Sequence, residues 1–141
     1  MGGIVVGMDG SDGSVQALKW ALEEARLRGS EVRACFVVDR IYTEPEWASL
    51  IIPSADELLR EGKRLLADSV AKAGGGEDVR QEVLIGEGHG PTKALLDAAS
   101  DADMLVVGSR GRGGFQGLLL GSVSQQVLHH AKCPVVVVPP T

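Results

Sequence analysis

Short apolar runs alternate with segments of helical periodicity along the chain, and this alternation limits the possible folds more than any other feature. The runs are rich in valine and isoleucine, which favours buried strands. They cover residues 4–8, 32–38, 79–85, 104–107 and 134–138. Helical periodicity marks a first segment that Gly29 ends and three further segments at residues 54–73, 91–100 and 122–130. Five strands alternating with four helices predict an α/β fold, a parallel sheet with helices on both faces.

The predicted sheet has the strand order 3-2-1-4-5 and belongs to a single domain that spans residues 1–141. A chain of 141 residues has the usual size of one domain, and no linker or repeat divides it. Gly29 is placed to cap the first helix at its C-terminus, and Pro91 suits the first turn of the third helix. The run 79–85 alternates most clearly between apolar and polar residues, which predicts a strand near an edge of the sheet.

Charge is distributed unevenly along the chain. The formal net charge is −5, which argues against general binding to nucleic acids or membrane surfaces. All 19 acidic residues lie between Asp9 and Asp103. The stretch 104–141 carries only Arg110, Arg112 and Lys132 as basic side chains that are charged at neutral pH. The absence of carboxylates from the last quarter of the sequence predicts an anion site there.

The two cysteines indicate a reducing compartment. Cys35 and Cys133 are too few for a disulfide scaffold, and both lie in apolar runs, so we expect buried free thiols. The N-terminus has neither the basic region nor the long apolar region of a secretory signal. No apolar run approaches the roughly 20 residues that span a bilayer. We therefore expect a cytoplasmic protein that does not bind membranes.

The glycine-rich stretch after the fourth apolar run is the most specific motif. It contains neither a P-loop nor the dinucleotide pattern G-x-G-x-x-G, because Gln116 stands where that pattern needs its third glycine. What remains is Gly108-x2-Gly111-x9-Gly121-Ser122. Glycines let backbone amides approach a phosphate, and a helix N-terminus adds free amides and the positive end of a dipole. The hydroxyls of Ser122 and Ser124 and the guanidinium groups of Arg110 and Arg112 also suit a polyanion.

The predicted topology brings two glycine-bearing turns together. Ligands of such sheets bind outside the carboxyl ends of the strands, where the strand order reverses. In the order 3-2-1-4-5 this point lies between the first and fourth strands. The turn Asp9-Gly10-Ser11 follows the first strand, and the loop 108–121 follows the fourth. Topology and glycine placement therefore predict the same binding site.

The motif, together with the N-terminal IVVGMDGS and the C-terminal CPVVVVP, resembles the universal stress protein family over essentially the whole chain. The resemblance implies a cytoplasmic homodimer with an adenine nucleotide alpha hydrolase-like fold that binds ATP, together with Mg²⁺ or Mn²⁺. It implies that Asp9 contacts the ribose or phosphates and that Val37 packs on the adenine. The residues that it implies around the ribose and phosphates are Gly108, Gly111, Gly121, Ser122, Val123 and Ser124.

Several of these residues also have a simpler structural explanation. Asp9 can cap the turn that follows it, and Ser122 can serve as the N-cap of its helix. His129 and His130 are adjacent at a helix end, where they cannot readily share a metal ion and where the dipole favours cations. His89 is interpreted as a solvated loop residue. The glycine loop itself can be an ordinary surface connection.

Three functions remain open on the sequence. The first is a regulatory or stress-response protein that binds ATP and is not an enzyme. The second is a slow ATP hydrolase or adenylating enzyme, for which Asp9 would have to orient the nucleophile because the loop offers no carboxylate or histidine. The third is an interaction protein without a nucleotide. The four valines at residues 135–138 predict a homodimer through the C-terminal strand in each case, because an uncovered apolar edge favours aggregation.

Overall fold

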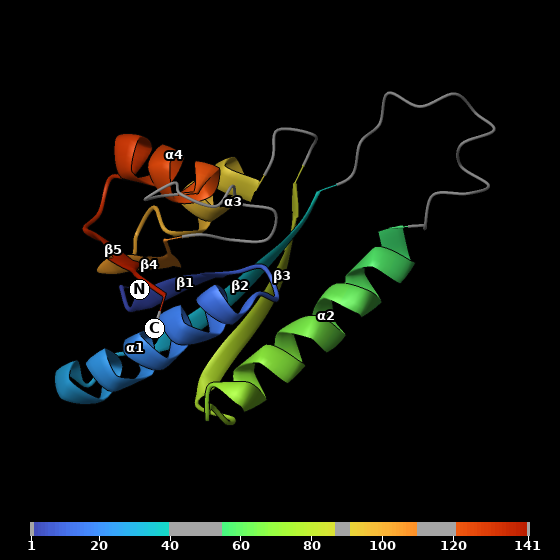
Figure 1. Cartoon of the computed structure of the whole chain (residues 1–141), viewed down its shortest axis with the longest axis horizontal. Helices are drawn as coiled ribbons and strands as arrows, with labels where there is room; N and C mark the ends of the chain where they lie inside the picture. Colours follow the sequence, from blue (N-terminus) through green and yellow to red (C-terminus); the bar gives the residue numbers. More distant parts are fainter. Residues whose placement is uncertain (1, 40–54, 87–90, 110–120, 141) are drawn as a thin grey trace.

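The computed structural model describes residues 2–39, 55–86, 91–109 and 121–140, and strands and helices alternate in them as predicted (Figure 1). The strands are β1 (Ile4–Met8), β2 (Val32–Asp39), β3 (Val79–Gly86), β4 (Met104–Gly108) and β5 (Val135–Val138). The helices are α1 (Asp12–Arg28), α2 (Ala55–Lys72), α3 (Pro91–Ala98) and α4 (Ser122–His130). These bounds lie within about two residues of the predicted ones.

The strands form one parallel sheet in the order β3-β2-β1-β4-β5, which confirms the predicted order. β1 is the central strand, and its first residue, Ile4, is paired with Val32 of β2 and with Met104 of β4. The chain proceeds outward from β1 through β2 to β3 and then crosses to β4 on the other side of β1. The strand order therefore reverses between β1 and β4.

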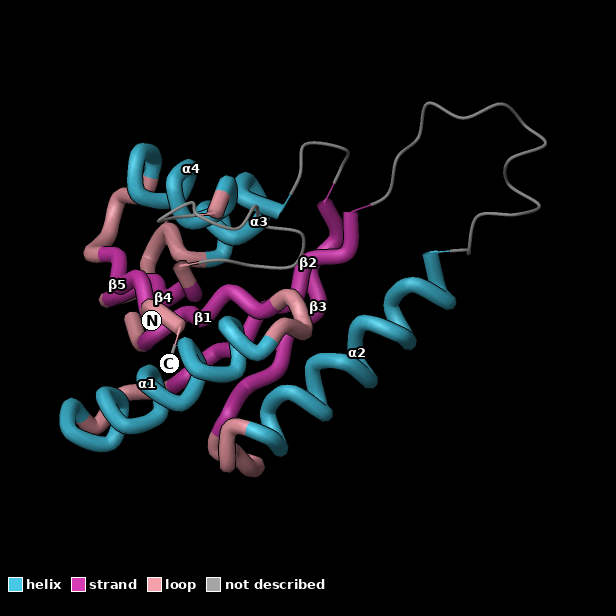
Figure 2. Tube along the Cα trace, viewed as in Figure 1, coloured by secondary structure: helices cyan, strands magenta, loops and turns pink. Residues whose placement is uncertain are grey.

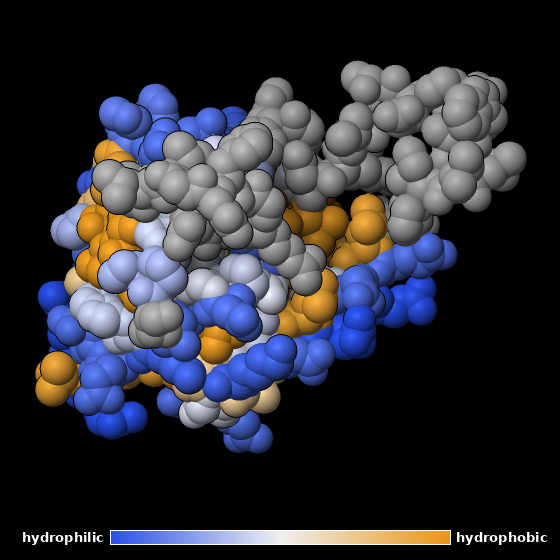
Figure 3. Space-filling view, in the orientation of Figure 1, coloured by the Kyte–Doolittle hydropathy of each residue, from blue (hydrophilic) through white to orange (hydrophobic). Residues whose placement is uncertain are grey.

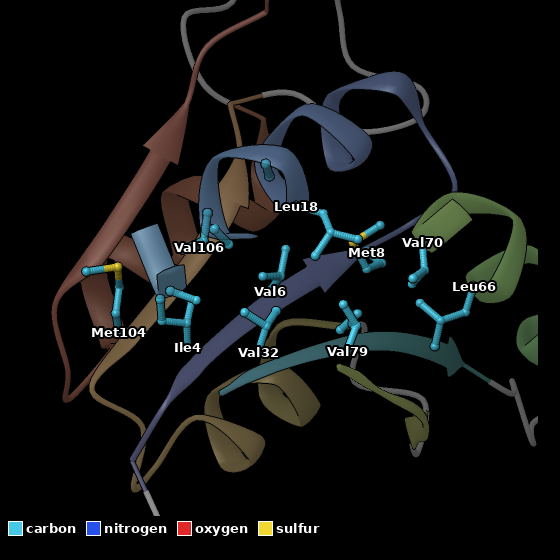
Figure 4. Packing of buried hydrophobic residues seen from close by; sticks show 14 residues of the cluster. Ile4, Val6, Met8, Leu18, Val32, Leu66, Val70, Val79, Met104 and Val106 are labelled. Carbon is cyan, nitrogen blue, oxygen red and sulfur yellow. The ribbon is translucent and has the colours of Figure 1, made fainter. Parts of the chain in front are cut away.

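Helices cover both faces of the sheet (Figure 2). α1 and α2 lie on one face, and α3 and α4 lie on the other. Alternate residues of β1 supply the two cores: Val6 packs in the cluster under α1 and α2 with Leu18 and Leu66, and Val5 packs in the cluster under α3 and α4. Figure 4 shows the first of these clusters between the sheet and its helices. Burial of β1 on both faces accounts for its uninterrupted apolar sequence.

Side-chain and backbone caps define both ends of α1. Ser11 is the N-cap residue, and its hydroxyl accepts a hydrogen bond from the Ser14 amide at 3.2 Å. Gly29 ends the helix in the left-handed conformation, with φ +67°, and its N–H donates to the Ala25 carbonyl. The predicted glycine cap is thus confirmed. Glycine suits this position because a residue with a side chain is strained at this φ.

The two edges of the sheet differ in chemistry. β3 lies at one edge, as predicted, and carries an ion pair in which Arg80 Nε lies 3.3 Å from Glu82 Oε1. β5 forms the other edge with four half-buried valines.

The surface over α1 and the outer face of α2 is mainly hydrophilic (Figure 3). Among the described residues, no helix is both long enough and apolar enough to cross a bilayer.

The predicted burial of the two thiols is right for one of them. Cys35 is fully buried in β2, but Cys133 is only partly buried in the turn before β5. The prediction for Cys133 fails because β5 lies at the edge of the sheet, where a neighbouring strand is present on one side only.

Candidate functional site

The carboxyl ends of β1, β2 and β4 bring together residues that are far apart in the sequence. Asp9 directly follows β1, Val37 lies near the end of β2, and Gly108 ends β4. The pairing of Met8 with Phe36 places Asp9 at the level of Val37 along the sheet. Between β1 and β4 the paired register runs only from Ile4–Met104 to Val6–Val106, although both strands continue beyond it. The strand ends that carry Asp9 and Gly108 therefore belong to the two strands between which the strand order reverses.

The turn after β1 is organised by the Asp9 side chain. Asp9 Oδ1 accepts hydrogen bonds from the Ser11 amide, at 2.9 Å, and from the Ser11 hydroxyl. Gly10 between them has φ +82°, which favours glycine. The Ser14 hydroxyl donates to the Ser11 carbonyl at 2.8 Å. Asp9 thus caps this turn, and the same bonds hold its carboxylate at the carboxyl end of β1.

Val37 belongs to the face of the sheet that α3 and α4 cover. It is half-buried and packs with the cluster that contains Val5, Leu95 and Val107. Its partner across β3 is Leu84, which packs on the same cluster. A partly exposed apolar surface at the carboxyl end of the sheet is suited to the face of a planar ring.

The junction between β4 and α4 is held by backbone and hydroxyl hydrogen bonds. The Ser109 carbonyl accepts from the Gly121 amide and, at 3.0 Å, from the Ser124 hydroxyl. The Ser109 amide donates to the Val138 carbonyl of β5 at 2.9 Å. The start of α4 is therefore fixed against the ends of both β4 and β5.

The predicted N-cap role of Ser122 is wrong. Gly121 occupies the N-cap position without a side-chain cap, and Ser122 is the first residue of the helix, with an exposed side chain. The cap moves to the glycine because its amide is bonded to Ser109 and it lies in extended backbone, at φ −77° and ψ 170°. The Ser122 hydroxyl is consequently directed to the surface.

The N-terminus of α4 is part of the candidate site because α4 is the helix that follows β4 in the chain. The Gln125 amide makes the first bond within the helix, to the Gly121 carbonyl at 3.0 Å. Helical geometry leaves the amides of Ser122, Val123 and Ser124 without an acceptor inside the helix. No acidic residue lies in the first turn. Such a helix end attracts anions through its amides and its dipole.

Part of the predicted site lies outside the described residues. Arg110, Gly111 and Arg112 belong to the stretch 110–120, and His89 belongs to the stretch 87–90. His129 and His130 end α4 with exposed side chains, and their ring centroids are 6.4 Å apart. The described residues contain no group of three potential metal ligands.

Two residues that organise the candidate site are missing from the sequence prediction. The first is Ser11, whose amide and hydroxyl hold Asp9. The second is Ser109, whose carbonyl joins β4 to α4 and whose side chain is buried. The Asp-Gly-Ser pattern signals a turn and points to Ser11. No local pattern points to Ser109, because its partners lie at least 12 residues away in the sequence.

A cleft of about 320 Å³ lies on the side of the molecule away from the carboxyl ends of the strands, between the C-terminal ends of α1 and α2. It is lined by side chains of both charges, among them Lys19, Glu23, Arg26 and Asp78. The amino ends of the strands lie on this side. Ligands of parallel α/β sheets bind at the carboxyl ends, so the cleft is not the candidate site.

These features define a class of protein: a doubly covered parallel sheet with an anion-attracting helix end where the strand order reverses. Within this class the chain belongs to the universal stress protein family, whose family model matches residues 1–139. A universal stress protein of Methanocaldococcus jannaschii is 32% identical over 145 residues, which cover 96% of this chain and 80% of the relative. Another, of Mycobacterium tuberculosis, is 32% identical over 155 residues, covering 97% of this chain and 48% of the relative. The chain thus spans about half the length of its mycobacterial relatives.

Known structures share the fold. The universal stress protein of Archaeoglobus fulgidus in complex with dAMP matches with a TM-score of 0.70 and 26% identity, covering 97% of each chain. A universal stress protein in complex with cAMP matches with a TM-score of 0.69 and 27% identity, covering 98% of this chain and 96% of the other. Both relatives were therefore solved with an adenine nucleotide.

Proposed function

We propose that this chain binds an adenine nucleotide, ATP in particular, at the carboxyl ends of β1, β2 and β4. The observation that carries the proposal is the topology: α4, with no acidic residue in its first turn, follows β4, and the Asp9 turn follows the neighbouring strand β1, where the strand order reverses. The dAMP and cAMP complexes of the relatives support the ligand class. The loop motif, with glycines at three fixed positions, supports a ligand with several phosphates.

The proposed contacts are those that the family resemblance implies, extended to the arginines of the loop. Val37 packs on the adenine ring, and Asp9 contacts the ribose or the phosphate region. The phosphates are bound by the amides at the start of α4, by the exposed Ser122 hydroxyl and by the loop residues Arg110, Gly111 and Arg112. Gly108 and Gly121 permit close approach of the backbone at the two ends of the loop, and Val123 supplies an amide.

A divalent cation fits this proposal only as a partner of the phosphates. The described residues supply no group of three ligands for it. Mg²⁺ is usually bound through one or two carboxylates together with substrate phosphates. We therefore propose that Mg²⁺ or Mn²⁺ enters with the triphosphate and is held mainly by it, with Asp9, directly after β1, as a carboxylate beside it.

The proposed role is regulatory and not catalytic. Phosphoryl transfer needs a residue that orients the nucleophile. Asp9 is the carboxylate that the proposal places in the site, and its Oδ1 accepts hydrogen bonds from the Ser11 amide and hydroxyl. A stress-response protein of this kind senses adenine nucleotides in the cytoplasm, and binding changes the surface that it offers to a partner. Turnover of ATP at about 1 per second or faster would contradict this role.

Calorimetry tests the proposed site directly. The double variant Gly121→Val with Ser122→Ala blocks the close approach at the start of α4 and removes the exposed hydroxyl. We expect its ATP affinity to fall at least about tenfold, which corresponds to about 1.4 kcal/mol. Ser100→Ala, in the exposed turn after α3, is the control and should bind ATP as the unmodified protein does. Unchanged affinity in the double variant would falsify the assignment.

We further propose that the chain forms a homodimer through β5. The strand is an edge strand of four half-buried valines, whereas the opposite edge carries the Arg80–Glu82 ion pair. Charged side chains discourage pairing at an edge, and a valine-rich edge invites it.

A further inference from the structure

The Ser124 hydroxyl is placed differently from the Ser122 hydroxyl, although both belong to the first turn of α4. Ser124 is 2% exposed, whereas Ser122 is exposed. The Ser124 hydroxyl lies 3.0 Å from the Ser109 carbonyl and 3.0 Å from the Gly121 carbonyl. One buried side chain thus joins the end of β4 to the first turn of α4.

The hydrogen-bond capacity of a hydroxyl makes this arrangement restrictive. A serine hydroxyl has one hydrogen to donate, and both neighbours of the Ser124 hydroxyl are carbonyl oxygens, which only accept. The oxygens of an ionised phosphate also only accept. To bind a phosphate, the Ser124 hydroxyl would have to withdraw its hydrogen from both carbonyls. The exposed Ser122 hydroxyl faces no such cost.

Ser109 is the fixed point of the junction. Its amide donates to Val138 of β5, and its carbonyl accepts from both the Gly121 amide and the Ser124 hydroxyl. These bonds set the position of the first amides of α4 relative to the sheet. The direction of those amides determines how well they match an anion, because hydrogen bonds weaken steeply when they are bent.

We infer that Ser124 is a positioning residue, whose hydroxyl holds the start of α4 against the end of β4 and does not itself bind phosphate. This inference rests on the proposed nucleotide function. The Ser124 hydroxyl orders the α4 N-terminus before the ligand arrives, and the amides of Ser122, Val123 and Ser124 then meet the anion. Ordering a site in advance lowers the entropic cost of binding.

The test compares Ser124→Ala with the matched control Ser122→Ala, which removes a hydroxyl from the same turn. The first readout is hydrogen exchange of the Gly121 amide in the nucleotide-free protein, measured by NMR. We expect Ser124→Ala to accelerate this exchange about fivefold, the effect of one lost hydrogen bond, and Ser122→Ala to leave it unchanged. Ser124→Cys keeps the side-chain shape, with a somewhat larger atom, but replaces a good donor by a weak one, and it should also accelerate the exchange, even if the alanine variant does not fold.

The second readout is the affinity for adenosine, AMP and ATP, measured by calorimetry. If Ser124 has a positioning role, Ser124→Ala should lower the affinities for AMP and for ATP by similar factors, about fivefold. Unchanged Gly121 exchange in the Ser124 variants would overturn the inference, and a loss that grows with each added phosphate would mark a direct ligand. If the wild-type protein binds none of the three, the proposed function fails, and the Gly121 exchange rate still decides whether Ser124 holds the junction.

Discussion

The conformation of single glycines separates stability from binding in this chain. Gly10 and Gly29 both have positive φ, at +82° and +67°, and an added Cβ at Gly29 would meet no atom within 4 Å. We expect Gly10→Ala and Gly29→Ala each to lower the free energy of unfolding by about 1 to 2 kcal/mol, because alanine is strained in the left-handed region. Urea denaturation measures both losses.

Of these two variants, only Gly10→Ala should also weaken nucleotide binding. Gly10 lies in the turn that holds Asp9, whereas Gly29 lies at the amino-terminal edge of the sheet, at the far end of α1. Calorimetry should therefore show weaker ATP binding for Gly10→Ala and unchanged binding for Gly29→Ala. Equal ATP affinities in the two variants would remove Asp9 from the proposed site.

The two thiols should differ in reactivity. Burial, with a smaller contribution from Glu82, raises the pKa of Cys35 from 9.0 to about 12, and the Cys35 sulfur lies 3.8 Å from Glu82 Oε2. Because the thiolate is the nucleophile, iodoacetamide at pH 8 should modify the partly exposed Cys133 and leave Cys35 intact. Peptide mapping by mass spectrometry measures both sites. Modification of Cys35 at the rate of Cys133 would show that β2 opens readily.

The raised pKa of Cys35 also predicts how stability depends on pH. The folded protein holds the Cys35 proton more tightly than the unfolded chain does, so this contribution is complete below pH 9. It is lost as the pH rises from about 9 to about 12. Urea denaturation across this window should show a fall in stability that is smaller in Cys35→Ala. A fall of the same size in that variant would assign it to other groups.

At the scale of elements, Arg33 of β2 fixes the end of α3. Its guanidinium donates to the Ala98 carbonyl at 2.9 Å and lies 3.6 Å from Asp101 and 3.9 Å from Glu82. The side chain is 20% exposed. Hydrogen bonds to charged groups contribute about 1.5 to 3 kcal/mol, so Arg33→Ala should lower the free energy of unfolding by about this amount.

An exposed arginine of α2 provides the control for Arg33. Arg64 pairs with Glu61 and Asp68 but is 63% exposed. Exposed ion pairs contribute little, so Arg64→Ala should lower the free energy of unfolding much less than Arg33→Ala does. Equal losses in Arg33→Ala and Arg64→Ala would mean that the end of α3 does not depend on Arg33.

The elements themselves were predictable from local pattern, and the contacts between elements were not. α4 begins at Ser122 and ends at His130 as its periodicity predicts, and Gly29 caps α1 as its position predicts. The N-cap prediction for Ser122 failed because the carbonyl of Ser109, directly after β4, accepts a hydrogen bond from the Gly121 amide. The roles of Asp9, Val37, Gly108, Gly121, Ser122 and Val123 toward a nucleotide stay predictions, as do those of Arg110, Gly111 and Arg112.

For the whole molecule, the backbone of β5 shows how a second copy can pair with it. The Leu105 amide donates to the Pro134 carbonyl, and the Ser109 amide donates to the Val138 carbonyl. In a strand the amide and carbonyl of one residue point to the same side, and those of the next residue point to the other side. The amides and carbonyls of Val135 and Val137 therefore point away from β4. These outward amides and carbonyls are the groups that an edge-to-edge dimer would use.

Replacing Val137 by proline should therefore prevent dimerisation. Proline removes the outward amide of Val137 and leaves the bonds between β4 and β5 in place, as is tolerated on edge strands. Val137→Ala is the matched control, because it loses the same valine side chain from the core under α3 and α4 but keeps the amide. Analytical ultracentrifugation at micromolar concentration should give a dimer for the wild-type protein and for Val137→Ala, and a monomer for Val137→Pro. A monomeric wild-type protein would contradict the dimer, and a dimeric proline variant would mean that the copies meet through a surface other than the β5 backbone.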